Sequence, residues 1–159
     1  MKVWKRTLAW LAVAGWMVVI FAFSAQTGNR SGNTSGEIVR WIIGLFYRGF
    51  ADLPQAKQAE VLELLHLVIR KGAHFTEYAV LAMLTANALR GYQISTVLGW
   101  CAPVAFSALY AATDEIHQYF VPDRACRLLD VGIDTAGALF GTAIFMLLGV
   151  IVKRISRFS

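Results

Sequence analysis

The sequence predicts an all-α protein: a polytopic membrane helical bundle with about four transmembrane helices plus one or two interfacial or amphipathic helices. Of the 159 residues, 57% are hydrophobic and only 16% are charged, and the mean hydropathy is +0.55. Soluble domains carry about a quarter charged residues. The apolar residues also form blocks flanked by basic residues, and several blocks approach the roughly 17 to 25 residues that cross a bilayer. These features exclude a disordered chain and a disulfide-stapled mini-domain.

The first predicted span covers residues 7–23. It follows a basic start, as the apolar core of a signal peptide would, and residues 22–24 resemble a cleavage site. The apolar run is long for a signal, however, and it contains Trp10 and Trp16. We therefore expect a retained transmembrane helix.

The next segments are predicted to lie at the membrane surface. Residues 27–35 are polar and rich in glycine and asparagine, which indicates a loop. Residues 38–50 are mostly apolar but too short to span, so we expect an interfacial or re-entrant helix. Pro54 marks the start of another helix, in which apolar residues from Val61 to Val68 recur at helical spacing. This amphipathic helix would lie along the membrane or pack on the bundle.

Three further spans are predicted at residues 73–89, 94–113 and 131–152. The middle one contains Pro103, which a buried bundle helix tolerates as a kink. In the last one, Gly137 and Gly141 form a small-xxx-small pair, which lets another helix approach closely. We expect these spans and the intervening segments to form a single membrane domain over residues 1–159.

The distribution of basic residues predicts the orientation. Basic residues at both ends of the chain and Arg90 after the second span place both termini in the cytoplasm, with four passes through the plasma membrane. The outer segment between the first two spans carries six basic residues, which departs from the rule, although surface-packed segments are poorly counted by it. The net charge of +5 thus reflects topology, and no basic face predicts nucleic-acid binding. Cys101 and Cys126 have no motif partner and are treated as incidental.

This topology gathers the unusual polar residues at the outer face of the bundle. Ionisable residues inside a membrane usually face one another or a wet cavity, because exposure to lipid is costly. Helical spacing places several of them on shared faces. The candidate catalytic residues are His74, Glu77, Asp114, Glu115, His117, Gln118, Asp130 and Asp134. The candidate substrate-binding residues are Ser24, Gln26, Arg70, Lys71, Tyr78 and Arg124.

The residue types support two kinds of chemistry. Carboxylates beside histidines transfer protons or bind a divalent cation, whereas Arg and Lys hold phosphate or carboxylate. An outer pocket with both features suits a lipid headgroup or a phosphate-linked carrier lipid. The cofactor is unknown: a divalent cation is possible, with candidate ligands His74, Glu77, Asp114 and His117, but their spacing is not diagnostic.

Simpler explanations remain open for several of these residues. Arg70 and Lys71 fit interfacial anchors that reach toward lipid headgroups. Glu77 and Asp134 fit structural ion pairs. The segment with Asp123, Arg124 and Arg127 fits a solvated loop.

The polar residues occur in blocks that resemble the VanZ-like membrane family, which is named for association with resistance to the glycopeptide teicoplanin. The blocks are residues 23–26 (FSAQ), 70–78 (RKGAHFTEY), 113–118 (TDEIHQ), 120–124 (FVPDR) and 130–137 (DVGIDTAG), in the family's order. Family members often have glycine where this chain has Asp123.

The resemblance implies a multi-pass bacterial cell-envelope protein that acts on lipid headgroups or lipid-linked saccharides. Its partner would be a membrane lipid or lipid-linked cell-wall precursor, and no nucleic acid. Whether the protein is an enzyme stays open. The alternative is a non-catalytic binder that masks or reorganises surface precursors and so limits glycopeptide access. A transporter is disfavoured, because the inner half of the bundle offers no polar path.

Overall fold

The computed structural model describes residues 2–26, 28–122, 124 and 126–156, without the side chains of residues 28–35. Within these residues all regular secondary structure is helical, as predicted. The helices are α1 (Val3–Ser24), α2 (Gly28–Phe46), the short 3-10 helix η1 (Phe50–Asp52), α3 (Gln55–Leu89), α4 (Thr96–Tyr119) and α5 (Leu128–Ile155).

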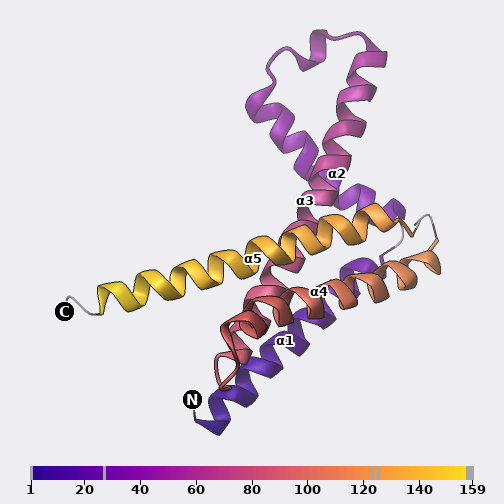
Figure 1. The fold of residues 1–159 in the computed structure, drawn as a ribbon. Coiled ribbons are helices and arrows are strands. Elements are labelled where there is room, and N and C mark those ends of the chain that lie inside the picture. The colour runs from indigo at the N-terminus through magenta and orange to yellow at the C-terminus, as the bar shows by residue number, and fades with distance from the viewer. Residues whose placement is uncertain (1, 27, 123, 125, 157–159) are drawn as a thin grey trace.

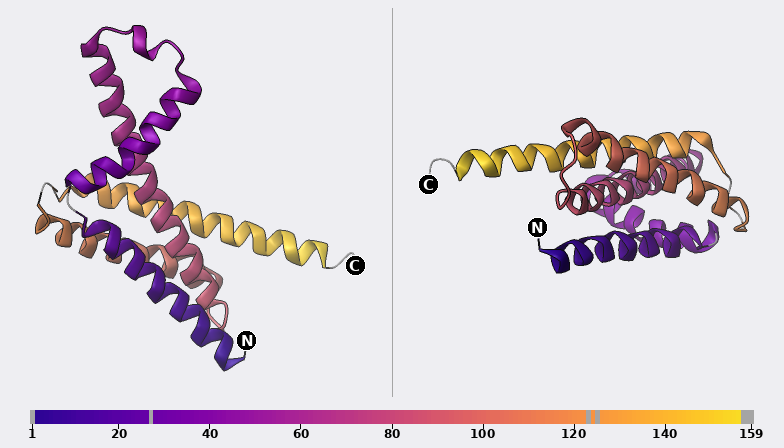
Figure 2. Two further views of the ribbon diagram at one scale, coloured as in Figure 1. Left: turned by 180° about the vertical axis from the view of Figure 1, so that it is seen from behind. Right: turned by 60° about the horizontal axis from the view of Figure 1, so that its bottom comes forward.

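The second half of α3 is the centre of the bundle. It lies among α1, α4 and α5 (Figures 1 and 2) and contacts all three of them. Tyr78, Leu81 and Ala82 of this half are fully buried. Two hydrogen bonds tie α1 to its neighbours: the Trp16 indole donates to the Glu77 carbonyl at 2.9 Å, and the Tyr110 hydroxyl of α4 donates to an α1 carbonyl at 2.7 Å.

Three of the predicted spans are confirmed as helices long and apolar enough to cross a membrane, namely α1, α4 and α5. Only 17% to 22% of their most apolar windows is buried, and large side chains such as Leu11, Val18 and Leu147 remain exposed. Apolar surface of this extent is typical of contact with lipid. The remaining predicted span, residues 73–89, carries His74 and Glu77 and is enclosed by other helices, so its passage through the membrane stays a prediction.

Two predicted boundaries were wrong. The amphipathic helix and the span at residues 73–89 are one continuous helix, α3, because the segment between them contains no proline and Gly72 costs a helix only about 1 kcal/mol relative to alanine. The polar segment 27–35 is not a loop from Gly28 onward, since α2 begins there. It too lacks proline, and its individual residues disfavour helix by about 1 kcal/mol or less. Thr27 lies outside the described residues.

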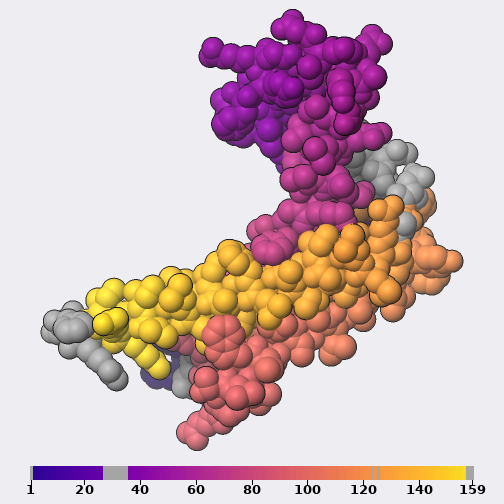
Figure 3. Space-filling view, turned by 45° about the horizontal axis from the view of Figure 1, so that its top comes forward, coloured from indigo at the N-terminus to yellow at the C-terminus, as the bar shows by residue number. Residues whose placement is uncertain are grey.

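The helix α2, η1 and the first half of α3 form a hairpin that projects from the bundle (Figures 1 and 3). Its two helices meet at Gly36, where a Cβ atom would lie 3.5 Å from the His66 ring, and at Val39, which is fully buried. The outward side of α2 exposes Trp41 and Phe46. The predicted interfacial and amphipathic helices therefore pack on each other: α2 leads the chain away from the edge of the bundle, and α3 leads it back (Figure 1).

The helices α3 and α5 pack backbone to backbone at the two glycines of α5. A Cβ at Gly137 would lie 2.9 Å from the carbonyl carbon of Phe75, and one at Gly141 would lie 2.7 Å from that of Ala79. Real side chains do not approach a backbone so closely, so only glycine fits at either position. The predicted packing role of the pair is confirmed, and the contact aligns the two helices in parallel.

Replacing Gly141 with alanine should therefore push α5 away from α3. We expect an apparent destabilisation of roughly 1–3 kcal/mol or more, as for overpacked cores, measured as a lower midpoint of thermal unfolding in detergent. Gly132→Ala in the same helix is the matched control, because nothing lies within 4 Å of that position. Equal midpoints for the two variants would contradict the tight contact.

Candidate functional site

Two adjoining cavities lie at the end of the bundle where α1 and α4 end and α5 begins. The polar pocket has a volume of about 250 Å³ and is lined by Arg70, Lys71, His74, Gln118, Arg124, Arg127, Asp130, Ile133 and Asp134. The apolar pocket has a volume of about 220 Å³ and is lined by Phe23, Ser24, Gln26, Ile38, Ile69, Arg70, Ala73, His74, Glu77 and Arg124. Arg70, His74 and Arg124 line both.

A histidine and a carboxylate face each other at the base of the polar pocket. His74 Nδ1 lies 3.6 Å from Oδ1 of Asp134, which is fully buried. This distance suits an ion pair but is too long for a hydrogen bond. Among the described residues, neither oxygen of Asp134 has a hydrogen-bond partner. A buried carboxylate without partners is costly, so Asp134 favours a protonated His74 or a small rearrangement that brings the two groups together.

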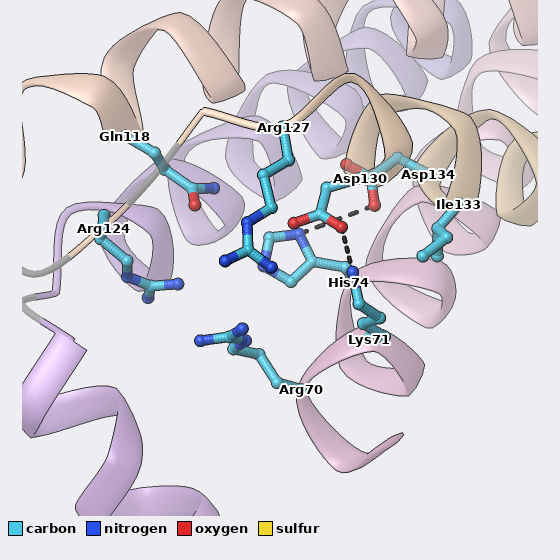
Figure 4. Close-up of a pocket in the computed structure, with 9 residues that line it drawn as sticks. All are labelled: Arg70, Lys71, His74, Gln118, Arg124, Arg127, Asp130, Ile133 and Asp134. Atoms are coloured by element: carbon cyan, nitrogen blue, oxygen red, sulfur yellow. Dashed lines mark hydrogen bonds and ion pairs between the residues drawn. The ribbon is translucent and has the colours of Figure 1, made fainter. Parts of the chain in front are cut away.

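An ion pair lies one helical turn before this pair. Lys71 of α3 binds Asp130 of α5 (Figure 4). The contacts Lys71–Asp130 and His74–Asp134 continue the parallel alignment that the glycines set farther along both helices. The acidic side of the site is thus a direct extension of the packing between α3 and α5.

Three arginines provide the positive side of the site. Figure 4 shows the guanidinium groups of Arg70, Arg124 and Arg127 turned toward the space beside the His74 ring. In the described part of the chain, none of them forms an ion pair. Burial lowers the pKa of Arg124, and the positive charge of Arg70 lowers it further. An anion bound among these groups would relieve their mutual repulsion.

The loop that carries Arg124 and Arg127 is anchored at two points. Arg124 Nε donates to the carbonyl of Gln26, at the end of α1, at 3.2 Å. The backbone N–H of Arg127 donates to a carboxylate oxygen of Glu115 at 2.8 Å. Glu115, itself almost fully buried, therefore holds the entry into α5. It lines neither pocket.

The other predicted site residues divide between the pockets and the protein interior. Gln118 lines the polar pocket and donates to Asp114 at 3.0 Å. Asp114 lines neither pocket, but it lies close enough to His74, Glu77 and Asp134 to interact with their charges.

Two predicted site residues contact aromatic rings. His117 packs on Phe21 of α1 with ring centroids 4.5 Å apart. Tyr78 is buried beside Tyr110, with ring centroids 6.3 Å apart. Neither lines the polar or the apolar pocket. His74, Glu77, Asp114 and Asp134 thus lie close enough for their charges to interact, whereas His117 packs against α1.

Several lining residues were absent from the predicted site. Arg127 had a usable signal, because it precedes Asp130 by three residues at the start of a helix. Phe23 had one too, because it begins the block at residues 23–26. The apolar lining residues Ile38 and Ile69 had none, since they come from different helices and belong to no block. Asp123, where the family often has glycine, lies outside the described residues.

The candidate metal ligands do not form a recognisable metal centre. Across the described residues, no three His, Cys, Asp or Glu side chains are grouped so that they could hold a metal ion. This applies to the set His74, Glu77, Asp114 and His117.

Comparison with known proteins agrees with the motif-based resemblance. A search of curated proteins found no match, and neither did a search of solved structures. The sequence profile of the VanZ/LLP1 family matches residues 9–149, which is most of the chain and includes every residue that lines the two pockets. The protein therefore belongs to the VanZ/LLP1 family.

Proposed function

We propose that the polar pocket binds the phosphate group of a membrane lipid or lipid-linked cell-wall precursor, and that His74 exchanges a proton with this headgroup. The observation that carries the proposal is the continuity of the two pockets. A cationic cavity and an apolar cavity adjoin and share Arg70, His74 and Arg124. A molecule with a charged head and a hydrocarbon tail fits such a pair.

The charge of the polar pocket favours phosphate. Its lining contains four cationic side chains, while its carboxylates are Asp130, already paired with Lys71, and Asp134, which faces His74. The three arginines are left to bind an anion, and their planar guanidinium groups match phosphate oxygens in a bidentate manner.

The apolar pocket favours a lipid over a soluble phosphate compound. Its lining includes the apolar residues Phe23, Ile38, Ile69 and Ala73. The phosphate of a soluble compound would use the arginines and leave these apolar residues in contact with water. The family's association with teicoplanin resistance supports a lipid-linked cell-wall precursor as the natural ligand.

The His74–Asp134 pair favours catalysis over binding alone. A buried carboxylate behind a histidine orients the ring and stabilises its charged form, which is how many enzymes hold a general acid or base. The alternative, a non-catalytic binder that masks or reorganises precursors, needs the arginines but not this pair.

His74→Asn and Asp134→Asn should therefore separate the two functions. In the enzyme, each exchange should reduce turnover by about 100-fold or more, while binding of the lipid changes little. Turnover would be followed by lipidomic analysis of a bacterial lipid extract incubated with purified protein, and binding by native mass spectrometry. His66→Asn, on the same helix but outside both pockets, is the control. If both variants instead keep lipid binding and glycopeptide resistance, the protein acts as a binder.

Arg124→Gln tests the phosphate site itself. Loss of a charge-assisted hydrogen bond should weaken binding of a phosphate-bearing lipid by about 10- to 100-fold. The matched control is Arg48→Gln, since Arg48 is exposed in the projecting hairpin and lines neither pocket. Equal affinity of the two variants would refute a phosphate site in this pocket.

We also place the site at the outer face of the plasma membrane, with both termini in the cytoplasm. Cys126 is exposed at the site end of the bundle. In a Cys101→Ser background, a membrane-impermeant maleimide should label Cys126 on intact cells. In a cysteine-free background, Ser156→Cys at the end of α5 should react only after permeabilisation. The opposite labelling pattern would show that the site faces the cytoplasm and that the end of α5 lies outside the cell.

A further inference from the structure

We propose that the protein holds an anionic phospholipid in a second site, the basic groove, at the end of the bundle opposite the polar pocket. The groove has a volume of about 590 Å³ and lies between the end of α3, the start of α4 and the last turns of α5. Its lining includes Arg90, Trp100, Phe145, Met146, Val150 and Lys153. Figure 3 shows the start of α4 beside the late turns of α5.

The groove has two cations and no acidic partner for them. Arg90 is the C-cap of α3, and its guanidinium lies 5.2 Å from the centre of the Phe145 ring. Lys153 is in the last turn of α5. Neither forms an ion pair with a described residue. The sequence contains no Asp or Glu from residue 78 to 113 or from residue 135 to 159, so no acidic residue of these segments supplies a counter-charge to Arg90 and Lys153.

The rest of the groove is mostly apolar and is open at the surface of the bundle. Trp100 and Val150 are exposed, and Met146 packs beside Gly99 of α4. Tryptophan is typical of the membrane–water interface, where a headgroup at Arg90 and Lys153 would leave its acyl chains along these side chains. A free phosphate would use only the two cations and leave the apolar wall uncovered. Basic pockets between transmembrane helices bind anionic headgroups in this manner.

Tryptophan quenching in lipid–detergent micelles provides a local test of the groove. Full-length protein would be titrated with dibrominated phosphatidylglycerol or dibrominated phosphatidylcholine of the same chain length. The protein has five tryptophans, so the difference between wild type and Trp100→Phe isolates the signal of Trp100. We expect phosphatidylglycerol to quench Trp100 at about tenfold lower mole fraction than phosphatidylcholine.

Variants that remove charge test whether the preference for phosphatidylglycerol over phosphatidylcholine depends on the cations of the groove. Arg90→Gln combined with Lys153→Gln should reduce the tenfold preference to about twofold or less. Lys5→Gln combined with Arg154→Gln removes the same charge from residues outside the groove lining and should keep it. Lys153→Gln alone should lower the preference for phosphatidylglycerol about threefold. This single variant provides the test if the double variant does not fold.

Three outcomes would overturn the proposal: no preference in the wild type, equal losses in the groove and control variants, or reversal of quenching by millimolar glycerol phosphate. The last result would show that the groove binds a free phosphate compound instead of a lipid. None of these outcomes bears on the polar pocket, because no residue lines both sites.

Discussion

The direct backbone contact between α3 and α5 is the constraint on which the rest of the molecule depends. Gly137 and Gly141 have no side chain where they face Phe75 and Ala79, so the two backbones come into direct contact at these positions. The helices run in parallel from this contact. One turn before Gly137 on α5, the same alignment sets His74 opposite Asp134, and one turn earlier still it sets Lys71 opposite Asp130. The packing of the bundle and the geometry of the site are thus one structural feature.

Charge burial explains the two hydrogen-bond anchors between α4 and α5. Asp134, Glu115 and Asp114 are all nearly inaccessible to solvent, and isolated carboxylates in such surroundings are costly. Two residues between α4 and α5 supply hydrogen-bond donors near these carboxylates. The backbone N–H of Arg127 donates to Glu115, and the Arg124 side chain donates to the Gln26 carbonyl at the end of α1. The resulting anchor keeps arginines at the mouth of the pocket while acidic groups occupy its base.

The two ends of the bundle differ in how their cations are balanced. At the site end, the arginines and Lys71 line one pocket together with the carboxylates Asp130 and Asp134, so an incoming anion must fit among groups of both signs. At the opposite end, Arg90 and Lys153 stand beside apolar walls without any carboxylate nearby in the sequence. The first arrangement supports selective binding and proton transfer, whereas the second supports retention of a lipid as part of the folded structure.

Much of the fold could be predicted from local patterns. Apolar length alone identified α1, α4 and α5, and the spacing of small residues identified the close contact on α5. Periodicity also placed His74 and Glu77 on one face of a helix. The continuity of α3 and the early start of α2 were missed, because glycine, asparagine and serine disfavour helix by too little to decide a boundary when tertiary contacts lie on either side.

By itself, the sequence determined the helical class, the apolar spans and the set of polar residues from which the site is drawn, because each of these depends on composition or on spacing within one helix. Only the tertiary structure decided which members of that set share a pocket. It placed Gln118 and Arg127 in the pocket lining, Glu115 beneath the loop and His117 against Phe21. The physical reason is that helical periodicity defines a face, whereas the rotation and depth of each helix follow from contacts with residues far away in the chain.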